Sequence, residues 1–215
     1  MIAGVVYRLI HVAARLLTGA YWRLKIVGRE RLPTSGPFVI APVHRSNLDF
    51  LLAGIAVPRP VRYLAKSSVF LGGPIDRFLA SMGAIPVDRN IADITAVRAC
   101  EAALADGWPV VVFPEGRRKS GPVVEDLFDG PAFLACRARI PVVPVGIGGS
   151  DAAMPIGSKF IRPHRVVIVV GEPIYPDVPA EGRVPRSAVR ELTARVRDEV
   201  QRLYDEAADR AGVPN

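Results

Sequence analysis

Short β-rich apolar runs alternate with helical stretches along most of the chain, and this alternation limits the possible folds more than any other feature. It begins after the turn-forming segment Pro33-Thr34-Ser35-Gly36-Pro37. Alternating strands and helices are typical of an α/β domain. We therefore predict an α/β fold with a mixed central sheet flanked by helices. The predicted strands are Phe38–Ala41, Val61–Ala65, Ala84–Val87, Val110–Phe113, Val142–Ile147 and Val166–Val170.

Four segments have the pattern of helices. Leu48–Val57 is apolar on nearly every side, Ala92–Ala105 is amphipathic, and Gly130–Ala138 is short and rich in small residues. The last, Ser187–Arg210, carries apolar residues at helical spacing with charged residues between them, so it is expected to cover the sheet. Its apolar positions are Val189, Leu192, Val196, Val200, Leu203 and Tyr204.

Residues 1–28 form a separate segment in this interpretation, and residues 29–215 form the α/β domain. The segment from Ile2 to Val27 is apolar with four basic residues interspersed, and its uninterrupted apolar runs are too short to span a bilayer. An amphipathic helix that lies at a membrane surface has this composition. Tyr21 and Trp22 beside Arg23 favour the membrane interface, where aromatic side chains concentrate.

Two other interpretations of this segment remain open. The helix can pack on the core with its basic residues in water. A cleaved signal peptide is also possible because Thr18-Gly19-Ala20 resembles a cleavage site, but Arg15 interrupts the apolar run that a signal peptide needs.

Charge and cysteine content limit the partners and the compartment. A net charge of +7 and a pI near 9.9 indicate anionic partners, such as lipid headgroups or phosphorylated small molecules. Nucleic acid is disfavoured because the basic residues are scattered among apolar stretches without a recognition motif. Cys100 and Cys136 have no C-x-x-C pairing, so we expect buried, reduced thiols. The expected location is the cytoplasmic face of the cell membrane, as a peripheral protein.

His44 and Asp49 lie five residues apart where a predicted strand meets an apolar helix. If His44 precedes the helix and Asp49 lies in its first turn, the carboxylate can accept from one ring nitrogen. The other nitrogen can then take a proton from a hydroxyl group, which is general-base catalysis. The alternative is structural: His44 satisfies a loop carbonyl and Asp49 caps the helix.

A second strand ends in a similar turn, in which Glu115 and Arg118 flank Gly116 and Arg117. Glycine permits close approach of a ligand to the backbone, and arginine presents a planar fork of donors that suits phosphate. A solvated basic loop is the alternative. Two such strand-to-turn junctions predict one composite site.

Four ordered blocks of residues resemble the motifs of the glycerolipid acyltransferase family. The resemblance covers about residues 25–175, and it includes Lys66 and the turn at Gly171-Glu172-Pro173-Ile174. The blocks are His44-Arg45-Ser46-Asn47-Leu48-Asp49, Gly83 to Arg89, Phe113-Pro114-Glu115-Gly116 with Arg118, and Val142-Val143-Pro144-Val145.

The resemblance implies transfer of an acyl group from acyl-CoA or acyl-carrier protein to the free hydroxyl of a lysophospholipid at a membrane. The acceptor most typical of the family is 1-acyl-sn-glycerol 3-phosphate, which gives phosphatidic acid. His44 would be the base and Asp49 would orient it, with no cofactor and no metal. Val43 and Arg117 depart from the family pattern, which has Asn and Thr there. The substrate-binding residues that the resemblance implies are Ser46, Lys66, Arg89, Glu115, Gly116 and Arg118.

Two further functions remain as alternatives. A lipid-binding module without turnover would need the basic surface and the N-terminal helix, but neither His44 nor Asp49. Serine hydrolysis through Ser46 or Ser150 is disfavoured because the chain has no G-x-S-x-G motif at either residue.

Overall fold

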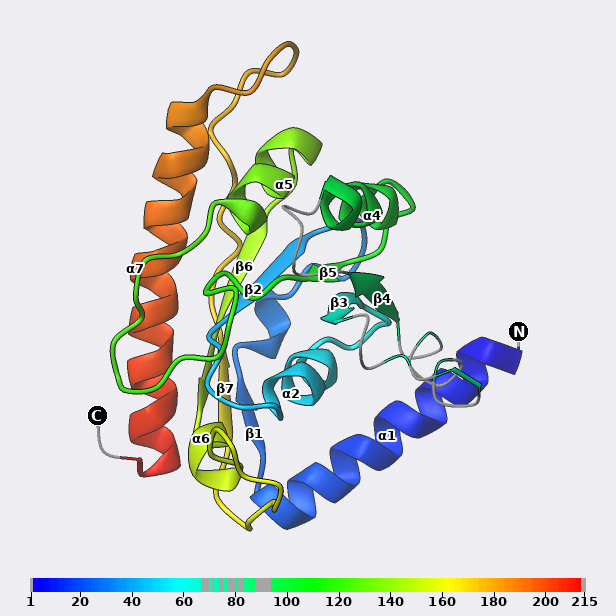
Figure 1. Ribbon diagram of the computed structural model, residues 1–215, viewed down its shortest axis with the longest axis vertical. Helices are drawn as coiled ribbons and strands as arrows, with labels where there is room; N and C mark the ends of the chain where they lie inside the picture. The colour runs from blue at the N-terminus through cyan, green and yellow to red at the C-terminus, as the bar shows by residue number, and fades with distance from the viewer. Residues whose placement is uncertain are drawn as a thin grey trace.

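The computed structural model describes residues 2–66, 70, 72, 73, 76, 80, 83–87 and 94–213, with the side chains of residues 2–11, 66 and 87 excepted. Within these residues a seven-stranded sheet has the order β1-β7-β6-β2-β5-β3-β4 (Figure 1). Neighbouring strands are parallel except β6 and β7, so the predicted mixed sheet is confirmed. The strands are β1 Lys25–Val27, β2 Val39–Pro42, β3 Arg62–Lys66, β4 Ala84–Val87, β5 Val110–Val111, β6 Val142–Gly148 and β7 Val167–Val170.

Helices cover both faces of the sheet. α7 packs against α5 and α5 against α4, so these three helices form one layer, and α2 and α1 lie on the other side (Figure 1). Residues 92 and 93 of the predicted helix 92–105 lie outside the described residues. The helical segments are α1 Ile2–Trp22, η1 Arg29–Arg31, α2 Asp49–Ala56, α4 Ile94–Ala105, α5 Gly130–Ala138, α6 Ser150–Ala153 and α7 Arg186–Ala211.

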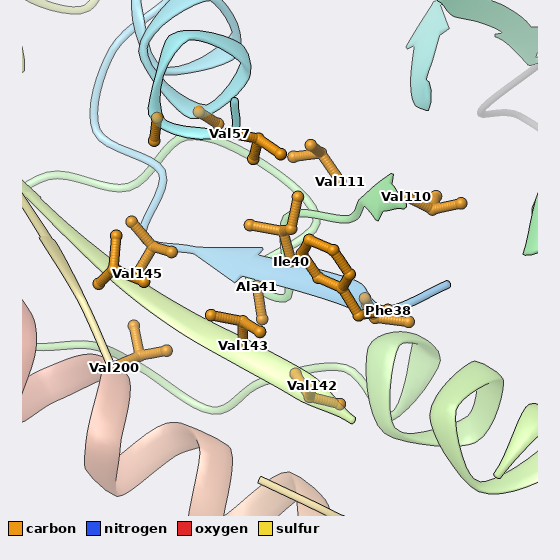
Figure 2. Close-up of a cluster of buried hydrophobic side chains, with 14 of the residues drawn as sticks. Phe38, Ile40, Ala41, Val57, Val110, Val111, Val142, Val143, Val145 and Val200 are labelled. Carbon is orange, nitrogen blue, oxygen red and sulfur yellow. The ribbon is translucent and has the colours of Figure 1, made fainter. Parts of the chain in front are cut away.

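The central strands are apolar at every position because both of their faces are covered. All residues of β2, β6 and β7 are buried, as expected for strands that lie between two helical layers. Successive side chains point to opposite faces. In Figure 2, Ile40 points toward Val57 at the end of α2, whereas Ala41 points toward the side of the sheet on which Val200 of α7 lies.

β5 is shorter than predicted. The sequence predicts a strand to residue 113, but the ladder ends at Val111, and Val112 adds one backbone bond to the carbonyl of Ile40 at 2.9 Å. Phe113 leaves the sheet and packs against the ring of His44. The chain therefore leaves the ladder two residues earlier than the sequence predicts.

The predicted covering helix is confirmed as α7, and glycine allows its close approach to β6. The six apolar positions predicted to face the sheet are all buried. A Cβ atom on Gly146 would lie 2.1 Å from the carbonyl oxygen of Leu203, and one on Gly148 would lie 2.3 Å from the carbonyl carbon of Ala207. Real side chains do not approach backbone that closely, so the two glycines set the distance between sheet and helix.

The N-terminal segment is helical as predicted, but two of its features differ from the prediction. Trp22, expected at a membrane interface, is 5% exposed because it packs in the core and its indole donates to the carbonyl of Arg162 at 3.2 Å. Residues 25–27 form β1, which pairs with β7 from the far end of the chain. No helix within the described residues is long and apolar enough to cross a bilayer.

Both cysteines are buried, free thiols, as expected. Burial, with the nearby carboxylate of Glu101, raises the pKa of Cys100 to about 12. Burial also raises the pKa of Cys136 above its ordinary value. Both thiols therefore stay protonated at neutral pH.

The glycine contacts give a test of the packing between β6 and α7. We expect Gly148→Ala to lower the free energy of unfolding by about 2 to 3 kcal/mol, because the added methyl group meets helix backbone that cannot move aside locally. Gly130→Ala is the matched control, since nothing lies within 4 Å of a Cβ atom there. Urea denaturation measures both, and equal stabilities would contradict the account.

Candidate active site

The site lies at one edge of the sheet, where two neighbouring parallel strands end. β2 ends at Pro42 and continues into a turn that reaches α2 at Asp49. β5 lies beside β2 in the same direction and continues into the segment 112–129. Parallel strands bring their carboxyl ends to one edge, which is where sites in such sheets form. The amide of Lys119 donates to the carbonyl of His44 at 2.9 Å, so the two turns are joined as predicted.

His44 precedes α2 and Asp49 begins it, which is the arrangement that the predicted contact requires. Nδ1 of His44 lies 3.1 Å from Oδ2 of Asp49, and both side chains are buried. The same oxygen accepts from the amides of Arg45 at 2.6 Å and Ser46 at 2.7 Å, which holds the carboxylate in place. An ionised carboxylate only accepts, so in this contact Nδ1 is the donor, and in the neutral imidazole Nε2 then presents its lone pair. Within the described part of the chain, Nε2 has no hydrogen-bond partner.

Two phenylalanines fix the plane of this imidazole. The ring of Phe113 lies 4.1 Å from the imidazole centroid at 31°, and Phe50 meets it edge-on at 5.5 Å. The two phenyl rings also contact each other, with centroids 4.8 Å apart. His44 is 4% exposed as a result. The packing leaves the imidazole little freedom to rotate away from Asp49.

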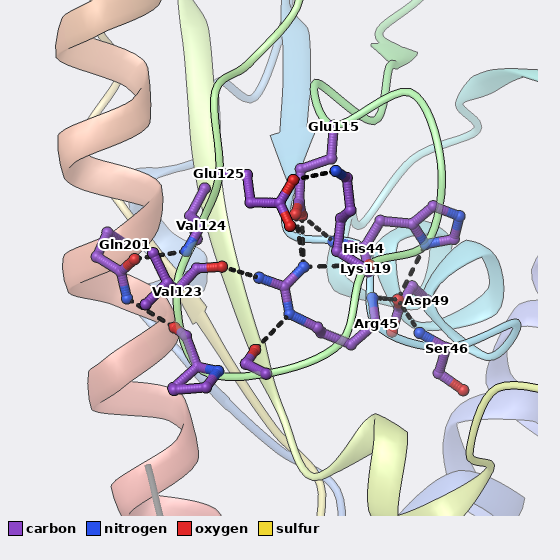
Figure 3. A network of polar contacts seen from close by, with 12 residues as sticks. His44, Arg45, Ser46, Asp49, Glu115, Lys119, Val123, Val124, Glu125 and Gln201 are labelled. Atoms are coloured by element: carbon purple, nitrogen blue, oxygen red, sulfur yellow. Dashed lines mark hydrogen bonds and ion pairs between the residues drawn. The ribbon is translucent and has the colours of Figure 1, made fainter.

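Beneath the His44 turn, Arg45 and Glu115 form an ion pair, both 1% exposed. Nη1 of Arg45 donates to Oε1 of Glu115 at 2.8 Å and to Oε2 at 2.6 Å. Oε1 also accepts from the amide of His44 at 2.9 Å (Figure 3). One carboxylate therefore holds both the buried guanidinium and the backbone of the histidine.

The other donors of Arg45 reach the segment that follows β5. Nε donates to the carbonyl of Gly121 at 3.2 Å and Nη2 to that of Val123 at 3.1 Å. Gln201 on α7 holds the same segment, since its Oε1 accepts from the amide of Val124 at 2.6 Å (Figure 3). The guanidinium lies over the ring of Tyr204 at 4.9 Å. The turn, the segment and α7 are thus bonded into one unit.

Gly116 and Arg118 shape the outer side of the site. Gly116 has a φ of 67°, and a Cβ atom there would lie 2.7 Å from the ring of Phe128, so only glycine suits the position. Arg118 is half-buried, and no hydrogen bond or ion pair to another described residue engages its guanidinium. Arg117 is exposed. Arg118 is therefore the cation of this turn that is both partly enclosed and available to an anion.

The other predicted substrate-binding residues either bond to the protein itself or lie partly or wholly outside the described residues. Ser46 is fully buried, and its Oγ donates to the carbonyl of Met154 at 2.8 Å rather than to His44. Both oxygens of Glu115 are engaged by the protein, so its implied substrate contact stays a prediction. The backbone of Lys66 belongs to β3, with its side chain outside the described set, and Arg89 lies outside the described residues.

The amino-acid sequence around this site matches a known protein family. The sequence model of the Acyltransferase family matches residues 23–148, more than half of the chain, including both turns. The chain belongs to the Acyltransferase family.

Two relatives and one solved structure show how far this chain resembles known proteins. A 1-acyl-sn-glycerol-3-phosphate acyltransferase of Chlamydomonas reinhardtii is 30% identical over 168 residues, 76% of this chain and 50% of that protein. One of Bacillus subtilis is 27% identical over 170 residues, 79% of this chain and 82% of that protein. The chain thus spans about half the length of the first relative. The crystal structure of the 1-acyl-sn-glycerophosphate acyltransferase PlsC from Thermotoga maritima shares the fold, with a TM-score of 0.71 and 23% identity, over 85% of this chain and 71% of that one.

Arg45 is the site residue whose role the sequence did not predict. It stands inside the first motif block, but its partner Glu115 is 70 residues away. The available signal was Glu115 itself, because a carboxylate at the end of a buried strand needs a partner. No cluster of three or more potential metal ligands occurs among the residues described, and the expectation of no cofactor stays a prediction.

The ion pair gives a second test. Glu115→Gln should lower the free energy of unfolding by about 3 kcal/mol or more, because Arg45 then stays buried without a counter-charge. Glu125→Gln is the control: this carboxylate is exposed and pairs with Lys119 at the surface, so little change is expected. Equal losses in chemical denaturation would show that burial of the Arg45 charge is not the cause.

Proposed function

We propose that the protein transfers a fatty acyl group from a thioester donor to the free hydroxyl of a lysophospholipid, with His44 as general base. The donor is acyl-CoA or acyl-carrier protein. The proposed acceptor is 1-acyl-sn-glycerol 3-phosphate, and the product is phosphatidic acid. The names of the Chlamydomonas reinhardtii and Bacillus subtilis relatives support this acceptor.

The observation that carries the proposal is the pairing of His44 with Asp49 beside an unoccupied ring nitrogen. Nε2 would take the proton of the acceptor hydroxyl as its oxygen attacks the thioester carbonyl. Asp49 would stabilise the imidazolium that forms, as the third member of a catalytic triad does. The tetrahedral intermediate would collapse by releasing the thiolate, which would recover the proton from Nε2. No metal or cofactor enters these steps.

A cation on the turn that is bonded to the His44 turn supports a phosphorylated acceptor. Arg118 follows the Glu115 turn, and a guanidinium suits a phosphate because it donates two parallel hydrogen bonds. We also assign Arg89 and Lys66 to the acceptor site from the resemblance to the family. Both substrates carry long hydrocarbon chains, so the proposed location is a membrane surface on the cytoplasmic side.

Release of CoA thiol tests the base. Purified protein would be given palmitoyl-CoA and 1-acyl-sn-glycerol 3-phosphate in mixed micelles, and His44→Ala should lower turnover about 1,000-fold, the usual order for loss of a general base. Asp49→Asn should be nearly as severe. His164→Ala is the control because His164 lies in a surface turn, where its Nδ1 contacts the carbonyl of Arg165.

Three results would contradict or redirect the proposal. Wild-type turnover by His44→Ala, with circular dichroism showing an unchanged fold, would exclude His44 as the base. Thiol release without acceptor would indicate hydrolysis. Tight lipid binding without transfer from either acyl-CoA or acyl-carrier protein would favour the lipid-binding module.

Arg118 gives a separate test of the acceptor. Arg118→Ala should raise the KM for the lysophosphatidate about tenfold or more, because a charge-assisted phosphate contact contributes roughly 1.5 to 3 kcal/mol. The KM for palmitoyl-CoA should change little. Arg117→Ala is the matched control, since that side chain is exposed on the same turn. If both substitutions raised the KM for the lysophosphatidate equally, the phosphate would be attracted by the general positive charge of the turn and not bound by Arg118.

A further inference from the structure

An exposed apolar face joins α1, α2 and the loop 155–163 that follows α6. We call it the docking face, and it consists of Leu17, Tyr21, Leu51, Phe160 and Ile161. Leu17 is 70% exposed and Phe160 is 80% exposed. Leu17, Tyr21, Leu51 and Ile161 line one open groove of about 520 Å³, so these side chains are contiguous although they come from three segments. A contiguous exposed apolar surface marks a site of contact with a partner or a membrane.

The loop is bonded at its base while its apolar side chains face outward. The amide of Arg162 donates to the carbonyl of Ala153 at 2.8 Å, and Ser158 Oγ bonds both the carbonyl and the amide of Phe160. Tyr21 and Trp22 of α1 donate to the carbonyls of Ile161 and Arg162 at 3.2 Å. These bonds hold the loop beside the end of α1 and fix Phe160 in an exposed position.

The two segments that supply most of the docking face carry charge of one sign. Segments 12–25 and 155–165 together contain six basic residues and no acidic residue, and all six basic side chains are exposed. The rest of the chain has 22 basic and 21 acidic residues, so these two short segments carry nearly all of the net charge of +7. Exposed apolar side chains among basic ones are the pattern of a surface that binds anionic lipid headgroups and inserts between them. The six are Arg15, Arg23, Lys25, Lys159, Arg162 and Arg165.

The docking face is also connected to the active-site turn. Met154 stands at the end of α6, immediately before the loop, and its carbonyl accepts from Ser46 Oγ at 2.8 Å. Leu51 of the docking face follows Phe50, whose ring packs against the imidazole of His44. A lipid surface on this face would therefore lie next to the turn that carries His44.

We propose that loop 155–163 is a second membrane-contacting element, which inserts Phe160 and Ile161 into an anionic bilayer beside α1. The inference rests on the proposed function for its lipid surface, and it adds a contact that the N-terminal helix alone does not supply. The occupant is the bilayer itself, because the face combines aliphatic and aromatic side chains with exposed cations on α1 and on the loop.

Co-sedimentation with vesicles tests the loop without any turnover. The vesicles contain phosphatidylcholine and phosphatidylglycerol in equal parts, and Phe160→Ser with Ile161→Ser should weaken binding about tenfold or more, from the lost apolar insertion. The bonds of the loop to α1 use backbone carbonyls, so the variant keeps them. The matched control is Ile94→Ser with Tyr175→Ser, two side chains of 66% and 64% exposure outside the docking face.

Reversing two charges of the loop measures the electrostatic contribution to vesicle binding. Lys159→Glu with Arg162→Glu should abolish the preference for phosphatidylglycerol over pure phosphatidylcholine vesicles, whereas Arg183→Glu with Arg190→Glu, the control at exposed positions elsewhere, should retain it. Vesicle binding that is unchanged in both loop variants would overturn the proposal. A wild-type dimer that dissociates in the Phe160 and Ile161 variant, with vesicle binding intact, would assign the face to a second copy of the chain and also overturn it.

Turnover of short-chain substrates that stay monomeric in solution distinguishes an effect on membrane binding from an effect on the proposed activity. The loop variants should retain wild-type turnover there within about twofold, because His44 and Asp49 are untouched. Loss of that turnover would mean that the loop supports the site rather than a membrane. If the wild-type protein transfers no acyl group at all, the vesicle measurements still decide the role of the loop.

Discussion

The site depends on the buried ion pair between Arg45 and Glu115. Removing both charges from water is costly, and the geometry offsets this because Arg45 donates to Glu115 and to backbone carbonyls, while Glu115 also accepts from the amide of His44. The pair joins the turn after β2 to the segment after β5. Glu115 therefore positions the backbone of His44, although its carboxylate bonds the amide of that residue and not the imidazole ring.

Asp49 holds the imidazole by a different route. Its Oδ2 accepts from two backbone amides of the same turn as well as from the ring of His44. A carboxylate fixed in this way cannot rotate away from the ring without breaking three contacts. Phe50 and Phe113 close the two sides of the imidazole, so the proposed base is oriented before any substrate arrives, which is what efficient proton transfer requires.

The turn that carries His44 is also connected to the docking face. The helix that begins at Asp49 carries Leu51 on its outer side, and Ser46 holds the carbonyl at which the loop 155–163 begins. Trp22 fastens the end of α1 to that loop from inside the core, whereas Tyr21 stays half exposed beside it. The proposed bilayer contact at this face therefore lies next to the turn that carries His44.

The sequence by itself determined the α/β class, most of the strands, the covering helix and the His44–Asp49 contact. Buried parallel strands read as unbroken apolar runs. The His44–Asp49 contact is local, because a histidine before the helix and a carboxylate in its first turn lie within reach of each other. Tertiary structure decided what depends on partners far away in the chain. β1 has only three residues and forms because it pairs with β7. Trp22 is buried because it packs in the core and donates to the carbonyl of Arg162. Arg45 pairs with Glu115 because β2 and β5 end at the same edge of the sheet. No local pattern encodes these contacts, since each requires the sheet to bring two distant segments together.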